Sequence, residues 1–195
     1  MDINQLKNYI LENFQQCIPE NLSYHGMHHT LNVLEVCGQY IDRMGVGEPD
    51  ANLLRTAALF HDLGFTRSYN NHEEHSVDIA QETLPGLGYS DDEIAVIAGI
   101  IRATKIPQQP TTVLEKIIGD SDLDYLGTTA FYETGETLFH ELVANGKLSD
   151  REEWDRLQVQ FLKSHRYHTA FAREHREPVK QLHLQQILDK WSWND

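Results

Sequence analysis

The sequence contains little cysteine, little basic charge and no long apolar run. Two cysteines among 195 residues, Cys17 and Cys37, cannot supply the disulfide framework of a small secreted domain. The N-terminus also lacks the basic and apolar regions of a signal peptide, so we expect a reduced, cytoplasmic protein. No stretch approaches the roughly 20 apolar residues that cross a bilayer, which argues against a membrane partner.

The charge balance restricts the possible ligands. Lys and Arg number 16 and Asp and Glu number 30, which gives a net charge of −14. A protein that binds nucleic acid generally is normally basic, so this class is excluded. A small phosphorylated molecule or nucleotide needs only a local site and stays compatible with the charge. The oligomeric state is left open.

The alternation of apolar and polar residues that marks half-buried strands is also missing. Apolar residues recur at helical spacing almost throughout, and "SDDE" at residues 90–93 has the Ser and Glu of a helix-starting capping box. An all-α fold is therefore predicted, in one domain over residues 1–195. The expected helices lie at about 3–14, 27–44, 53–63, 72–84, 90–104, 111–126, 128–145, 149–165 and 169–190.

Histidine is abundant, with 11 residues, and one histidine ends an apolar run. In "LLRTAALFHDLGF", residues 53–65, a predicted core helix leads into His61 and Asp62, and Gly64 suits a helix that ends there. Burying an imidazole or a carboxylate costs several kcal/mol unless its lost hydration is replaced. A hydrogen-bonded partner or a metal ion would replace it.

Two further polar residues are predicted to face inward from helices. His29 shares a helix face with Val33 and Cys37. On the later segment "VLEKIIGDSDLDYL", Asp122 lies at the edge of the apolar face. Asp120 and Asp124 fall nearer the opposite, solvated side. Taken alone, His29 would be a core histidine bonded to backbone, and Asp122 a cap or a surface charge.

Together these residues favour a metal site. His29, His61, Asp62 and Asp122 would bring imidazoles and carboxylates from three helical segments to one place. Imidazole and carboxylate ligands suit divalent metals of mixed nitrogen and oxygen preference. One ion, which could be Mn, Fe, Ni, Mg or Zn, would compensate all four groups.

The ordered set of His, His-Asp and Asp, in the contexts "YHGMHHTLNV", "AALFHDLGF", "NHEEHSVDIA" and "GDSDLDYLG", resembles the HD superfamily of metal-dependent phosphohydrolases. The resemblance covers residues 20–130. It implies a helical bundle with a central metal pocket, on which the helices of residues 130–190 would pack or which they would cover. It also implies that a metal-activated water hydrolyses a phosphomonoester or phosphodiester, with a small phosphorylated compound or a nucleotide as substrate.

The resemblance extends to residues outside the ligand set. "YHGMHH" is similar to a stretch of cyclic-nucleotide phosphodiesterases in which the first histidine is an acid, which implies that role for His25. His72 resembles the additional histidine of two-metal HD proteins, and either His25 or His72 would protonate the leaving group. Phe65 and the stretch "RATKIP" depart from the two-metal pattern, so one ion is expected. Within that stretch Lys105 is either a cation for substrate phosphate or an exposed lysine.

A metal-dependent phosphohydrolase is therefore the predicted function, with Asp62 orienting the attacking water. Two alternatives stay open: a regulatory module that binds a nucleotide without turnover, and a di-iron oxygenase of the HD fold. The last predicted helices also carry a local basic zone, which either forms a solvated helix face, the interpretation that we favour, or closes over the pocket and contacts a phosphate. It comprises Lys163, Arg166, Arg173, Arg176 and Lys180.

Overall fold

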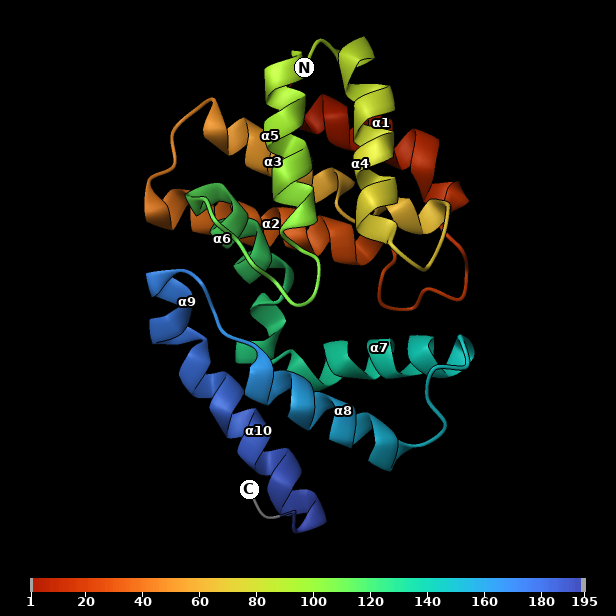
Figure 1. Ribbon diagram of the computed structural model, residues 1–195, viewed down its shortest axis with the longest axis vertical. Coiled ribbons are helices and arrows are strands. Elements are labelled where there is room, and N and C mark those ends of the chain that lie inside the picture. The colour runs from red at the N-terminus through yellow and green to blue at the C-terminus, as the bar shows by residue number, and fades with distance from the viewer. Residues whose placement is uncertain (1, 194–195) are drawn as a thin grey trace. The chain divides into compact units, whose positions relative to one another are not determined.

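Helices make up the regular structure of the computed structural model, which describes residues 2–193 and has no strand among them (Figure 1). The predicted all-α fold is confirmed. The chain divides into two compact units, Met1–Asp122 and Leu123–Asp195. Unit 1 contains α1 (Ile3–Phe14), α2 (Met27–Met44), α3 (Asp50–Phe60), α4 (His72–Thr83), α5 (Asp91–Arg102) and α6 (Val113–Asp122). Unit 2 contains α7 (Phe131–Ala144), α8 (Arg151–Ser164), α9 (Ala170–His175) and α10 (Glu177–Trp191).

Helix α3 lies at the centre of unit 1, packed against α1, α2, α5 and α6. Its residues 56–60 are all completely buried. A helical segment without a polar face must be covered on all sides, and this holds for the end of α3, directly before His61. The buried histidine and aspartate that follow are thereby delivered to the interior of unit 1.

Several helix boundaries follow from local chemistry. The predicted capping box forms at the start of α5, where Ser90 accepts the Glu93 backbone N–H and Glu93 accepts that of Ser90. Helix α2 ends at Met44, and the next residue, Gly45, has a φ of +64°, the left-handed conformation that glycine adopts readily.

Two predicted helices end earlier than expected. Helix α3 stops at Phe60 rather than Leu63, and a short 3₁₀ helix, Leu63–Thr66, follows the His-Asp pair. The predicted helix at 111–126 stops at Asp122, before a 3₁₀ helix at Asp124–Gly127. Both changes of backbone geometry occur beside residues of the candidate site.

The predicted helix at 169–190 is divided in unit 2. Helix α9 ends at His175, and α10 begins with Pro178 in its first turn, where proline's missing N–H leaves no helical bond unmade. The basic zone of this region is not a uniformly solvated face. Lys180 is completely buried and Arg176 is half-buried, because each has an acidic partner inside unit 2.

The two cysteines and the possibility of a membrane-spanning helix concern the chain as a whole. Cys17 is exposed, Cys37 is buried, and both are free thiols. No helix within residues 2–193 is both long enough and apolar enough to cross a membrane. One domain over residues 1–195, with helices of 130–190 on the pocket, stays a prediction.

Candidate metal centre

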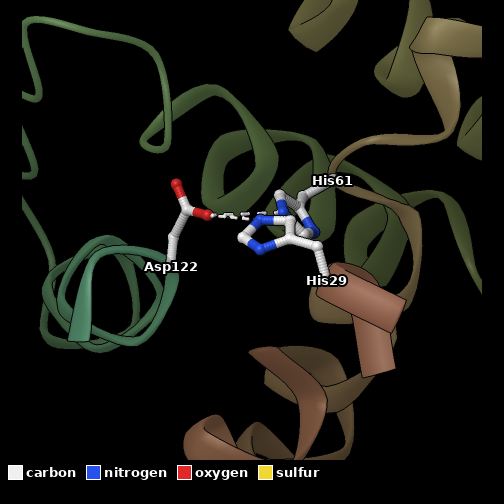
Figure 2. Close-up of side chains that lie close together, drawn as sticks. All are labelled: His29, His61 and Asp122. Carbon is white, nitrogen blue, oxygen red and sulfur yellow. Dashed lines mark hydrogen bonds and ion pairs between the residues drawn. The ribbon is translucent and has the colours of Figure 1, made fainter. Parts of the chain in front are cut away.

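Three side chains from three helical segments meet inside unit 1: His29 of α2, His61 after α3, and Asp122 at the end of α6 (Figure 2). The Oδ1 atom of Asp122 lies 3.0 Å from His29 Nε2 and 3.6 Å from His61 Nε2. One ligand atom from each residue lies within 4.8 Å of the others, so the group could hold a metal ion.

Asp62 adds a second carboxylate to this group. Its Oδ2 atom lies 3.2 Å from His61 Nε2 and 3.4 Å from His29 Nε2. His61 Nε2 and Asp62 Oδ2 are both buried and have no hydrogen-bond partner. A buried polar atom without a partner costs about 1–3 kcal/mol, so these two neighbouring atoms call for a cation between them.

The tautomer of His61 strengthens this argument. Its Nδ1 lies 2.9 Å from the carbonyl oxygen of Ala58, which can only accept a hydrogen bond. Nδ1 therefore carries a proton, and in the neutral ring Nε2 presents its lone pair to the carboxylates. This is the arrangement in which proteins fix a ligating histidine, with the other ring nitrogen held by backbone. The donor set thus fits a divalent ion.

The turn that carries the pair is held by Ser76, a residue that the sequence interpretation missed. The Ser76 hydroxyl donates to the His61 carbonyl oxygen at 2.5 Å and accepts the Gly64 N–H at 2.8 Å. A Cβ at Gly64 would lie only 1.9 Å from the carbonyl oxygen of His72. Gly64 therefore permits close approach of this turn to α4, and it is not the end of α3 as expected from sequence.

His25 and His72 lie beside the ligand group, and both contact Phe65. The phenyl ring of Phe65 stacks on His72 at 4.0 Å and on His25 at 4.3 Å between ring centroids. His72 Nε2 also lies 3.5 Å from Asp62 Oδ1, the oxygen that does not face His61. Burial lowers the pKa of His72, so its imidazole is neutral at neutral pH. The structure thus brings both histidines to the edge of the site.

Lys105 lies in the loop after α5 and is exposed. Its Nζ donates to Asn71 Oδ1 at 3.1 Å, and Asn71 directly precedes His72. The lysine is therefore tied to the start of α4, on the side of the cluster where His72 stands.

Two aspartates of α6 and the following turn are not placed as expected from sequence. Asp120 is completely buried and Asp124 is only 6% exposed, so neither lies among solvated charges. Residues 117–121 of α6 are all buried, and a helix buried on every side gives no periodic signal to orient its charges. Asp124 lies beyond the helix, where its Oδ1 accepts the Arg176 Nε–H at 2.8 Å.

The carboxylates favour a protonated His61 when no metal is bound. Burial opposes its charge, but the adjacent Asp62 and Asp122 carboxylates prevail and raise the pKa of His61 well above its usual value. The pKa of each carboxyl is lowered, because its imidazole neighbours outweigh the effect of burial. The metal-free site thus holds a proton that a metal ion would have to displace.

A pH dependence of stability follows. A histidine whose pKa rises on folding stabilises the protein below its unfolded-state pKa, and the contribution is lost as pH rises through the folded pKa. With chelator, we expect the melting temperature to fall from about pH 6.5 upward through this group. Excess Mn²⁺ should oppose the fall, because metal binding strengthens as the proton leaves. His61→Asn, which cannot take the proton, should lose both trends; an unchanged pH profile in that variant would contradict the assignment.

Comparison with known proteins agrees with this geometry. The HD domain family model matches residues 26–123, which include all four members of the ligand group. The chain is 23% identical over 161 residues to the deoxynucleoside triphosphate triphosphohydrolase SAMHD1 homolog of Dictyostelium discoideum. That match covers 66% of this chain and 31% of the relative, so the chain spans less than a third of the relative's length.

Two solved structures are similar in fold. Bacillus subtilis YpgQ, crystallised in complex with ADP, has a TM-score of 0.64 at 18% identity, with 97% of each chain covered. A Lactobacillus plantarum protein has a TM-score of 0.67 at 15% identity, with 98% of this chain and 97% of that chain covered. The family model covers half of the sequence and includes the whole cluster of imidazoles and carboxylates. The chain belongs to the HD domain family.

Proposed function

We propose that this protein is a metal-dependent phosphohydrolase that acts on a small phosphorylated compound of the nucleotide class. The observation that carries the proposal is the unpartnered, buried pair of His61 Nε2 and Asp62 Oδ2 within a group of His and Asp side chains. His29, His61, Asp62 and Asp122 would hold the ion. In such a site a divalent metal supplies activation of water and polarisation of a phosphoryl oxygen.

The residues around the ligand group would organise the reaction. Asp62 turns Oδ2 toward the imidazole ligands and Oδ1 toward His72, so Oδ1 can accept a hydrogen bond from the attacking water. Attack on phosphorus in line with the leaving oxygen breaks the phosphorus–oxygen ester bond. The leaving oxygen takes a proton from a histidine at the rim. Because burial lowers the pKa of His72, its imidazole does not hold the extra proton that a general acid must supply, and this favours His25 as the donor.

The names of the similar proteins support a nucleotide as the substrate. One is named a deoxynucleoside triphosphate triphosphohydrolase, and a structural neighbour was crystallised with ADP. The test is a panel of nucleoside mono-, di- and triphosphates, cyclic nucleotides and nitrophenyl phosphates, each assayed with Mn²⁺, Ni²⁺, Mg²⁺ and Zn²⁺. Hydrolysis of a nucleotide that requires added metal is expected. Failure of the metal-loaded protein to hydrolyse any member would overturn the proposal.

Lys105 should act on the substrate and not on the metal. A second ion would need its own ligands, and a lysine ammonium near it would repel it, by about 4 kcal/mol for two unit charges 4 Å apart at an effective dielectric near 20. The same ammonium attracts a phosphate. Lys105→Ala is expected to raise KM or lower kcat about tenfold, as for a contributor of about 1.4 kcal/mol, and to leave one equivalent of metal by elemental analysis. Two equivalents held through dialysis would contradict the single-ion site and make His72 a ligand.

A further inference from the structure

The backbone directly after Asp122 is held by buried groups from the C-terminal part of unit 2. The hydroxyl of Tyr167 lies 3.2 Å from the carbonyl oxygen of Leu123 and 3.4 Å from that of Asp124, and donates toward both. Tyr167 is only 3% exposed. Arg176 adds the charged bond from its Nε to the Asp124 carboxylate. Leu123 and Asp124 are thus both restrained through their carbonyl groups, and Asp124 also through its side chain.

The restraint continues along the 3₁₀ helix and the residue after it. The carbonyl oxygen of Thr128 lies 2.9 Å from His183 Nε2 of α10. At Gly127, an added Cβ would lie 2.4 Å from the carbonyl oxygen of Arg176, so the two backbones are in contact. The segment 123–128 therefore rests closely against the start of α10 and its first turns.

The turn before Tyr167 is held by a buried cation, Lys180. The Nζ of Lys180 donates to the carbonyl oxygen of His165 at 2.7 Å and pairs with Glu177 at 3.0 Å. Burial, together with the Lys180 charge, lowers the pKa of His165 to about 3, so the imidazole is neutral beside the lysine. The turn that carries the Tyr167 ring is thus anchored to α10 by a side chain with no exposed surface.

We propose that Tyr167 and Arg176 are positioning residues for the metal ligand Asp122. Asp122 is the last residue of α6, where the helix no longer restrains the carbonyl groups, and one peptide bond separates it from Leu123. The contacts of Tyr167 and Arg176 described above lie within unit 2 and act on Asp122 through that peptide bond. Groups behind a ligand commonly set its orientation and the affinity for the metal. This inference rests on the metal site proposed above.

The test uses Co²⁺, whose visible absorption reports the geometry of its ligands, bound to the full chain. Tyr167→Phe removes only the hydroxyl, and we expect it to weaken Co²⁺ binding about tenfold and to change the absorption bands. The matched control is Tyr132→Phe, because the Tyr132 hydroxyl also lies in unit 2 but donates to Gln186 Oε1 at 2.8 Å. The control should bind Co²⁺ with the affinity and spectrum of the unmodified chain.

Arg176→Lys serves as the second variant, since it keeps the charge but not the Nε–H geometry, and should give a smaller change of the same kind. Unchanged Co²⁺ affinity and spectrum in both variants would overturn the positioning role, even if their melting temperatures fell. If the unmodified chain bound no Co²⁺, the metal site itself would be refuted and this inference with it. A spectral change in Tyr132→Phe equal to that in Tyr167→Phe would also count against it.

Discussion

Replacing Asp62 by alanine is expected to abolish both metal binding and metal-dependent hydrolysis. The substitution removes the carboxylate whose Oδ2 faces His61 and His29 and whose Oδ1 faces His72. Because water without a metal has a pKa of 15.7 rather than about 7, we expect the rate to fall by at least about a thousandfold. His61→Ala should have the same effect, because it removes a ligand whose Nδ1 is already fixed by Ala58.

The control for this experiment is Asp155→Asn. Asp155 is a buried carboxylate of unit 2 that accepts from Lys190 and from the Trp191 indole and is not a member of the ligand group. It should lose stability, by about 1–3 kcal/mol, and keep its metal and its activity. Metal content by elemental analysis and hydrolysis of the best substrate are measured together. An Asp62→Ala protein that retained both at the unmodified level would refute the assignment of this site.

The core helix of unit 1 and the residues that follow it can be predicted from sequence, because the pattern of apolar residues that predicts them lies within a single helix. All of residues 53–60 except Arg55 have apolar or hydroxyl side chains, which is typical of a core helix, so we expect a histidine and an aspartate at its end to reach the interior. The same reasoning placed His29 inward from the spacing of Val33 and Cys37, which are both completely buried. These are properties of one helix, and periodicity describes one helix well.

The rest of the site depends on contacts between segments far apart in sequence. Ser76 holds the His61 turn across 15 residues, and nothing in its own neighbourhood indicates this bond. The contact of Phe65 with His25 and His72 likewise depends on the 3₁₀ helix that replaces the end of the predicted helix. A charge pattern does not identify a distant partner, so the sequence favours a solvated face for Arg176, whereas the structure pairs it with Asp124.

Asp122 and Asp124 should respond differently to the same loss of charge. The Asp122 carboxylate lies between His29 and His61, so Asp122→Asn is expected to lose the ion and, in chelator, to lose the stabilisation that the two imidazoles give the carboxylate. Asp124 instead neutralises Arg176 beyond the end of α6. Asp124→Asn should lower the free energy of unfolding by about 1–3 kcal/mol, because it leaves a partly buried guanidinium without its charged acceptor.

Urea unfolding in chelator and metal content at saturating Mn²⁺ separate the two variants. Asp124→Asn should still take up one equivalent at saturation, whereas Asp122→Asn should take up none, since an amide is a far weaker ligand than a carboxylate. The unmodified chain in chelator serves as the reference for the stability of both variants. The opposite pattern, with the ion kept by Asp122→Asn and lost from Asp124→Asn, would mean that the 3₁₀ helix at Asp124–Gly127, and not the end of α6, supplies the carboxylate ligand.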